Sequence, residues 1–361
     1  MSIEAESIDA VDRPGELPER PLVTVLVPAY NESLKITSSL ETIYAYMQDL
    51  EDRYRFELLV VDDGSTDDTA QQVQAFAEGR PELRLLRQPS NMRLGQALRD
   101  GFAASHGDIV VVFDSDLSYS VDHIGRMIDT MVEEKVTIVI ASPYMEGGQV
   151  SAIPWSREVM SKQANRMLSL TSQYPIKTIT AMVRAYSGPF IRSVSLKAMG
   201  PEINTEIMYK AQIMRARVAE IPAHLDWSDQ AERIAKRKVS LKVSTTSKLL
   251  VFASFLYRPI AFFLIPGLVL LAVSMWSSLS LLATVLDNTE EVGNWDQKLT
   301  HGFAHAWEQR PQTFIIAGFT LVIAVQLISL GLLATQAKRY FEELFYASNR
   351  RRSRRRTDDV S

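Results

Sequence analysis

Short apolar segments alternate with amphipathic ones over the first part of the chain. The apolar segments are rich in the aliphatic and β-branched residues typical of buried strands, and they span Leu22–Val27, Phe56–Val61, Leu83–Leu86, Ile109–Phe113 and Thr137–Ala141. Between them, apolar residues recur at helical spacing, as in Leu94–Ser105 and Val121–Val132. Strands that are apolar throughout and alternate with helices predict an α/β fold on a doubly wound, mostly parallel sheet.

The pattern is less regular between residues 142 and 225. Helices are predicted over Ser156–Ser172 and Asn204–Ala216, and a strand is predicted over Ala181–Tyr186. Further on, the short apolar segment Leu249–Tyr257 is typical of a helix that lies along a membrane surface.

Polar clusters follow three of the predicted strands. Tyr30–Asn31–Glu32 follows the first, Asp62–Asp63 follows the second, and Asp114–Ser115–Asp116 follows the fourth. In open parallel sheets, ligands bind beyond the carboxyl ends of the strands. Polar turns are common on any protein surface, so one cluster alone would be weak evidence. Three together predict a ligand site at this edge of the sheet.

Asp114 and Asp116 are the strongest candidates for chemistry at that edge. Side chains two residues apart on an extended segment point to the same side, so the two carboxylates are expected to face one point. Hard oxygen ligands suit Mg²⁺ or Mn²⁺ that carries a phosphate-bearing ligand. The residues alone leave open an ordinary acidic turn, because Asp and Ser are common turn residues.

Two later stretches, 259–286 and 311–337, contain no Asp, Glu, Lys or Arg. Each is longer than the ~20 apolar residues that cross a bilayer. Buried core helices are the alternative, but charge-free runs of this length are rare in soluble domains. The sequence therefore predicts two transmembrane helices after the α/β domain.

Charge is segregated along the chain, although the net charge is only −4. The segment 231–258 and the tail 338–361 are basic, whereas the loop 287–310 between the spans is mainly acidic. The positive-inside rule then places the α/β domain, 21–230, and the tail in the cytoplasm. The expected location is the cytoplasmic membrane, with the loop outside and its Trp295 and Trp307 suited to the membrane interface.

The composition of the chain excludes several kinds of site and classes of protein. Residues 1–20 form an acidic leader that is expected to be disordered and lacks the pattern of a secretory signal. The chain has no Cys, which excludes disulfides and thiolate metal sites and is compatible with a reducing compartment. No Gly-x-Gly-x-x-Gly follows the first strand and no Walker loop is present, which argues against a dinucleotide oxidoreductase. Because spans adjoin the arginine-rich tail, it is expected to contact lipids rather than nucleic acid.

Four motifs occur in a characteristic order. They are Val-Pro-Ala-Tyr-Asn-Glu at 27–32, Val-Asp-Asp-Gly-Ser-Thr-Asp at 61–67, Asn91 with Gly95 and Ala97, and Asp114–Ser115–Asp116. In this order they resemble the inverting glycosyltransferases of family 2, which have the GT-A fold, over about residues 22–240.

The middle of the chain resembles one group within that family, the polyprenyl-phosphate sugar synthases of the dolichol-phosphate mannose and glucose type. The matching residues are Gly147–Gly148, Trp155, Arg157, Ser161, Ala164–Asn165, Arg184–Ala185–Tyr186, Glu206 and Glu220–Ile221–Pro222. Several members of this group carry two C-terminal spans. The resemblance implies transfer of one sugar, with inversion, from a UDP- or GDP-sugar to undecaprenyl or dolichyl phosphate.

The resemblance also implies roles for single residues. The nucleotide base and ribose would contact Pro28, Tyr30, Glu32 and Asp63. Asp114 and Asp116 would hold Mg²⁺ or Mn²⁺ on the diphosphate, and Ser118 stands where some relatives have a third ligand. Arg157 would meet the lipid phosphate, and Glu206 would face the sugar or the reacting phosphate. Arg233, Lys236 and Arg237 would belong to a segment that closes over the phosphates.

Two departures from the group leave the acceptor open. Pro143 stands where relatives have an Arg, and the segment after Arg233 lacks their Gly. Another membrane lipid, as in a glycolipid synthase, is therefore an alternative acceptor. A processive polysaccharide synthase is disfavoured, because Ile234 follows Arg233 where those enzymes have Trp. A non-catalytic scaffold is disfavoured by the retained Asp114 and Asp116. Paired spans often associate, so a homo-oligomer is possible.

Overall fold

The computed structural model describes residues 17–153, 155, 158–159, 161–163, 165–166, 176–228, 259–287 and 294–358, without the side chains of 259–261, 342–343 and 345–358. Most of the predicted leader, the basic segment 231–258 and its predicted surface helix lie outside the described residues. Two compact units are present. One carries the β-sheet, and the other spans Ser254–Leu344.

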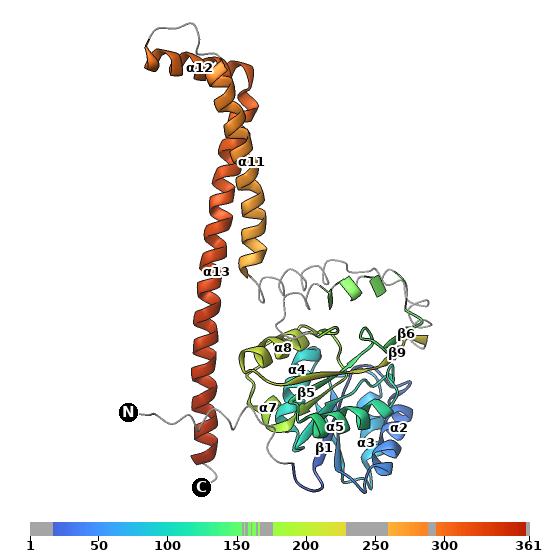
Figure 1. Ribbon diagram of the computed structural model, residues 1–361. Coiled ribbons are helices and arrows are strands. Elements are labelled where there is room, and N and C mark those ends of the chain that lie inside the picture. Colours follow the sequence, from blue (N-terminus) through green and yellow to red (C-terminus); the bar gives the residue numbers. More distant parts are fainter. Residues whose placement is uncertain are drawn as a thin grey trace. The chain divides into compact units, whose positions relative to one another are not determined.

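The first unit is built on a sheet of seven strands in the described part of the chain, in the order β3-β2-β1-β4-β7-β5-β8 (Figure 1). The strands are β1 Leu22–Ala29, β2 Arg55–Asp62, β3 Leu83–Arg87, β4 Ile109–Val112, β5 Ile138–Ser142, β7 Arg184–Ser187 and β8 Val218–Pro222. All neighbouring pairs are parallel except those of β7, which runs antiparallel to β4 and β5. The predicted α/β class with a mostly parallel sheet is confirmed.

Helices cover both faces of this sheet. They are α2 Ile36–Asp49, α3 Thr69–Ala77, α4 Leu94–Ala104, α5 Asp122–Glu134, α7 Gly188–Ser193 and α8 Ile203–Ile213. Val23, Val25 and Val27 point to one face, where they join a core that includes α2 and α5. On the other face, Gly101 of α4 packs so closely on Leu26 and Val61 that a Cβ atom would overlap Leu26. The apolar face of each helix is therefore buried against the sheet, which is what drives this layering.

A second sheet of two strands lies beside the loop that follows β4. It pairs β6 Gln149–Ser151 with β9 His224–Asp226 in parallel. The backbone N–H of Asp226 also donates to the carbonyl oxygen of Ser118 at 2.9 Å. The chain around Asp226 therefore lies beside the loop that carries Asp114 and Asp116.

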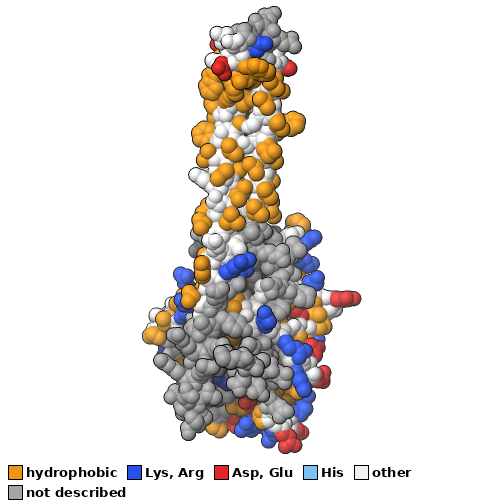
Figure 2. All heavy atoms as spheres, turned by 60° about the vertical axis from the view of Figure 1, so that its left-hand side comes forward, with side chains coloured by type: hydrophobic (Ala, Val, Ile, Leu, Met, Phe, Trp, Pro, Cys, Tyr) orange, Lys and Arg blue, Asp and Glu red, His pale blue; other side chains and the backbone are white. Residues whose placement is uncertain are grey.

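The second unit contains α11 Pro259–Asp287, α12 Trp295–Gln309 and α13 Pro311–Asp358. Helices α11 and α13 approach closely through small residues: the Ser274 hydroxyl donates to the Ala317 carbonyl oxygen at 2.9 Å, and Ala324 is buried. Phe262–Asp287 and Pro311–Phe341 are long and apolar enough to cross a membrane. Their outer faces are covered by exposed hydrophobic side chains (Figure 2). The prediction of two long apolar helices is confirmed.

Two expectations about this unit were wrong. Residues 287–310 were expected to form a connecting loop, but most of them form helix α12. The second apolar helix was expected to end at residue 337, but α13 continues to Asp358. No Gly or Pro follows Gly331 in the sequence, and the Ala, Leu, Glu, Lys and Arg residues there favour a helix, so nothing in the local chain stops it.

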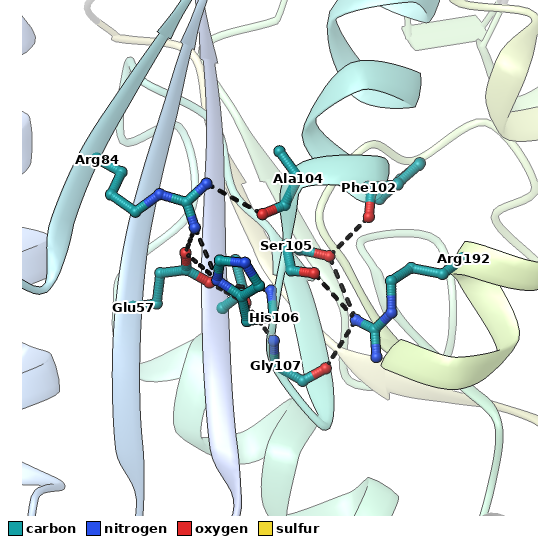
Figure 3. A network of polar contacts seen from close by, with 9 residues as sticks. Glu57, Arg84, Phe102, Ala104, Ser105, His106, Gly107 and Arg192 are labelled. Carbon is teal, nitrogen blue, oxygen red and sulfur yellow. Dashed lines mark hydrogen bonds and ion pairs between the residues drawn. The ribbon is translucent and has the colours of Figure 1, made fainter. Parts of the chain in front are cut away.

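The amino ends of the strands, at the edge opposite the polar clusters, are held by a buried carboxylate (Figure 3). Glu57 accepts hydrogen bonds from the Thr24 hydroxyl at 2.9 Å and from the backbone N–H of His106 at 3.1 Å, and it pairs with Arg84. These contacts join β1, β2, β3 and the chain that enters β4. Arg192 of α7 donates to the carbonyl oxygen of Gly107 at 2.9 Å and extends the network.

We expect Glu57→Ala to lower the free energy of unfolding of the sheet unit by roughly 3 kcal/mol, because it leaves buried donors and Arg84 without their partner. The thermal midpoint of the full chain in detergent should fall by about 2–4 °C per kcal/mol. Near-ultraviolet circular dichroism, recorded as the temperature is raised, measures this midpoint.

Arg53→Ala is the matched control. Arg53 pairs with Asp129 at 2.8 Å, but its side chain is 52% exposed, so its removal should cost less than about 1 kcal/mol. Equal losses in the two variants would contradict the role given to Glu57.

Candidate functional site

The loops after β1 and β2 are joined by hydrogen bonds at the carboxyl edge of the sheet. The backbone N–H groups of Asn31 and Glu32 donate to the hydroxyls of Ser65 and Thr69, both at 2.9 Å. Asn31 adopts a left-handed conformation, with φ of 55°. Its side-chain oxygen accepts from the backbone N–H of Thr66 at 2.9 Å. The two predicted polar clusters therefore form one connected surface.

The predicted nucleotide-contacting residues differ in accessibility. Pro28 is buried inside β1, opposite Val61, so its side chain belongs to the core. Tyr30 is 41% exposed at the end of that strand, and Glu32 is partly exposed beside it. Of these three, Tyr30 and Glu32 are accessible to a ligand.

Asp63 ties the loop after β2 to the loop before α4. Its side chain is almost fully buried and accepts a hydrogen bond from the backbone N–H of Met92 at 2.7 Å. Burial raises the pKa of Asp63, although hydrogen bonds from the Met92 and Arg93 backbones oppose the rise. Gly64 adopts a φ of +68°, and a Cβ atom there would overlap the Ser90 backbone, so glycine is required for this approach.

Asp114 and Asp116 lie close together, but not for the reason expected from the sequence. Strand β4 ends at Val112, and the two carboxylates lie on a turn that contains Leu117 with φ of 53°. The expectation that they share one side of an extended segment was therefore wrong. The hydroxyl of Ser118 donates to Asp114 at 3.4 Å, and its backbone N–H donates to Asp116 at 3.0 Å. The turn brings all three predicted metal ligands together.

The electrostatics of this turn favour a bound cation. Burial and the negative charge of Asp116 raise the pKa of Asp114 to about 7, despite the hydrogen bond from Ser118. A divalent cation would stabilise both ionised carboxylates, so the residues present fit such a metal. In the described ranges, no group of three or more His, Asp or Glu side chains could hold a metal ion. Mg²⁺ held by one or two carboxylates usually also binds substrate phosphates and water.

Tyr119 lies near these carboxylates and Arg184 lies near Tyr119, and neither was assigned a role from the sequence. Arg184 is fully buried on β7, opposite Val112 of β4, and donates to the carbonyl oxygens of Ala181 at 2.7 Å and Ile179. Burial and the charge of Asp114 raise the pKa of Tyr119, and the charge of Arg184 opposes that rise. A charged residue inside the otherwise apolar segment Ala181–Tyr186 was the signal in the sequence.

The carboxylate of Glu206 is occupied by hydrogen bonds and an ion pair within the protein. It lies in the first turn of α8 and accepts backbone hydrogen bonds from Lys197 at 3.0 Å and Ala198 at 2.8 Å. It also pairs with Lys210 at 2.5 Å. The following residue, Met199, accepts a hydrogen bond from the backbone N–H of Gly95 at 2.8 Å. Glu206 therefore holds a loop against the start of α4.

The predicted cations of the site, Arg157, Arg233 and Lys236, lie outside the described residues. Five positions after Arg157 in the sequence, Lys162 pairs with Glu158 at 2.6 Å. Pro143, which replaces the expected Arg, is buried directly after β5.

The family model described as glycosyl transferase family 2 matches residues 24–194. The chain is similar to dolichyl-phosphate beta-glucosyltransferase ALG5C of Trichomonas vaginalis, with 26% identity over 62% of this chain and 68% of that protein. It is also similar to dolichol-phosphate mannosyltransferase of Pyrococcus furiosus, with 29% identity over 55% of each chain, so it spans little more than half of that relative. Among solved structures, it is similar to glucosyl-3-phosphoglycerate synthase from Mycobacterium tuberculosis in complex with Mn²⁺, UDP and glucosyl-3-phosphoglycerate. That likeness has 21% identity, covers 63% of this chain and 76% of the other, and has a TM-score of 0.42.

We expect Asp114→Asn to raise the thermal midpoint of the metal-free protein by several degrees at pH 8, and by less at pH 5. The pKa of Asp114 is raised to about 7 in the folded protein, so the carboxyl group is harder to ionise there than in the unfolded chain. The free energy of unfolding therefore decreases as the pH rises from about 4 to 7. Asn avoids that decrease. Thermal unfolding in the presence of EDTA measures the difference.

Asp67→Asn is the control for this prediction. Burial alone would raise the pKa of Asp67, but hydrogen bonds from Thr69 and Ser33 lower it to about 2. Asp67 is therefore ionised at both pH 5 and pH 8, and its replacement should destabilise the protein equally at both. A pH-independent effect of Asp114→Asn would contradict the raised pKa.

Proposed function

We propose that this chain is a membrane-bound family 2 glycosyltransferase, because residues 24–194 match that family's model, and that it transfers one sugar from a UDP- or GDP-sugar to a polyprenyl phosphate, with inversion. The convergence of Asp114, Asp116 and Ser118 on one turn is the observation that carries this proposal. Two relatives that are named as dolichyl-phosphate sugar transferases support the acceptor. The two long apolar helices support the membrane location.

The donor would bind across the carboxyl edge of β1, β2 and β4. We propose that Tyr30, Glu32 and Asp63 lie on the nucleoside side of that site and that Asp114 and Asp116 lie on the diphosphate side. Mg²⁺ or Mn²⁺, when bound, would offset the negative charge that develops on the leaving diphosphate. The buried Arg184 adds a fixed positive charge beside Tyr119, whose hydroxyl also feels the charges of Asp114 and Asp116. This arrangement stabilises the departure of a nucleoside diphosphate.

The acceptor needs positioning more than activation. A phosphate monoester is already anionic near neutral pH, so it can attack the anomeric carbon without a general base. Attack from the side opposite the leaving diphosphate inverts that carbon. Cationic side chains would hold the acceptor phosphate, and we propose Arg157, Arg233 and Lys236 for this role. Ser228, the last described residue before Arg233, lies five positions away in the sequence, a reach of up to ~17 Å.

We propose that Glu206 is a positioning residue. It was expected to face the sugar or the reacting phosphate, but its carboxylate already accepts from Lys197 and Ala198 and pairs with Lys210. It would act through the loop that it holds against α4 near Asp63.

For orientation, we propose that the sheet unit and the arginine-rich tail face the cytoplasm. The basic residues of 231–258 and 338–361 flank the two apolar helices, and the chain between these helices is mainly acidic. The basic segments would also contact anionic lipid headgroups, at about 1 kcal/mol per charge near the surface.

The buried Pro143 favours one second candidate, transfer to another membrane lipid as in a glycolipid synthase. The test uses the full chain in liposomes that contain undecaprenyl or dolichyl phosphate, a diacylglycerol, or neither. Each liposome receives labelled UDP- or GDP-sugars, and the extracted lipids are separated. A labelled product only with polyprenyl phosphate is expected. A labelled product only with diacylglycerol would overturn the acceptor, and nucleotide-sugar binding without any turnover would indicate a scaffold.

We expect Asp116→Asn to lower sugar transfer by about 100-fold or more, because it removes one of two anionic ligands from the ion that stabilises the leaving diphosphate. Wild-type transfer should likewise stop in EDTA and return with Mn²⁺ or Mg²⁺. Asp129→Asn, on the outer surface of α5, is the control and should keep wild-type turnover. Undiminished transfer by a folded Asp116→Asn protein would remove the metal assignment.

We expect Arg157→Ala to raise the KM for polyprenyl phosphate by about tenfold while the KM for the nucleotide sugar is unchanged, because a charge-assisted contact to the acceptor is lost. Lys162→Ala removes a nearby cation that already pairs with Glu158, and its KM values should stay near those of the wild type. A change in donor KM alone would place Arg157 on the other substrate.

A further inference from the structure

Helix α12 has two apolar surfaces, and the described residues of the chain cover one of them. The covered surface carries Gly302 and Ala306, which are buried. A Cβ atom on Gly302 would lie 2.7 Å from the carbonyl oxygen of Val285, so α12 packs on the backbone of α11. Figure 1 shows α12 running crosswise to α11. A large side chain at position 302 would prevent this contact.

The second apolar surface is exposed. It consists of Trp295, Leu299, Phe303 and Trp307, which recur every fourth residue and so form one stripe along the helix. Trp295 is 73% exposed and Trp307 is 52% exposed. The polar side chains Gln297, His301, His305 and Glu308 lie on the opposite arc of the helix. An amphipathic helix with this pattern is suited to a boundary between an apolar phase and water.

The contacts of α12 fix its depth relative to the apolar helices. Val285, on which Gly302 packs, precedes the last residue of α11, Asp287, by two positions, which is about 3 Å along a helix axis. At the other end, the Trp307 and Phe314 rings are 5.4 Å apart, and Arg310 donates to the hydroxyl of Ser280 at 3.1 Å. Helix α12 therefore lies where α11 ends and α13 begins.

We propose that α12 lies in the membrane–water interface, with Trp295, Leu299, Phe303 and Trp307 inserted among the lipids and the polar arc in water. This proposal rests on the proposed membrane location of the two apolar helices. A lipid surface fits the stripe because Trp is favoured at the interface and because the neighbouring surfaces of α11 and α13 are apolar. Arg310 alone separates α12 from α13, so this anchor sets the depth at which α13 enters the bilayer.

The absence of Cys from the chain allows a direct test. The variants Phe303→Cys, Glu308→Cys and Leu279→Cys each receive a nitroxide label, and the full chain is reconstituted into vesicles of zwitterionic and anionic phospholipids. Phe303 marks the apolar stripe, Glu308 marks the polar arc of the same helix, and Leu279 marks an exposed position on α11. Collisions with oxygen and with a water-soluble nickel complex are measured for each label.

The label at position 303 should favour oxygen over nickel, at a depth of about 5–10 Å below the headgroups. The label at 308 should favour nickel, and the label at 279 should lie deeper than both. Equal nickel access at 303 and 308, with 279 still protected, would overturn the interfacial position of α12 and leave the membrane location intact. Spin–spin broadening at 303 with protection from both reagents would overturn it in favour of contact with a second copy. Nickel access at 279 would overturn both proposals.

Discussion

Parallel pairing of β1 with both β2 and β4 is the constraint on which the site depends. The register places Ala29 opposite Asp62 and Leu26 opposite Val112. All three strands therefore end at one edge of the sheet, and the polar residues that follow them meet there. The carboxylate of Glu57 holds the opposite ends of β1 and β2 through Thr24 and Arg84. A slip of one residue in this register would turn every core side chain of a strand to the wrong face, so burial and site geometry are fixed together.

The carboxyl edge combines uncompensated negative charge with a buried positive charge that cannot move. Asp114 and Asp116 repel each other in a partly buried turn. Arg184 donates hydrogen bonds to the backbone carbonyl oxygens of Ala181, Asn204 and Ile179, which hold its guanidinium in place. Such a site is stabilised by a cation and an anion that arrive together. A metal–diphosphate complex has that composition, which links the fold to the transfer that we propose.

The helical unit is held together by a different kind of contact. Its inner contacts use small residues and one hydroxyl, Ser274, because close backbone approach replaces apolar burial where the surroundings are themselves apolar. Its outer faces are apolar and exposed. Helix α12 shares both features: Gly302 packs against α11, and Phe303 points to the surroundings. The described surfaces of the two apolar helices thus suit the membrane location that we propose.

The sequence by itself determined the α/β class, the two long apolar helices and the resemblance to glycosyl transferase family 2, because apolar periodicity, charge-free length and motif order are local properties of the chain. It also identified Asp114, Asp116 and Ser118 as a group. It did not predict that a turn, rather than an extended strand, brings them together, or that Arg184 is buried opposite the last residue of β4. Helix α12 was overlooked because its Trp, Leu and Phe residues are spread among charged ones. Only the tertiary structure decided that Pro28 is buried, that Glu206 holds a loop, and that β7 runs antiparallel, because each of these depends on contacts between residues far apart in the chain.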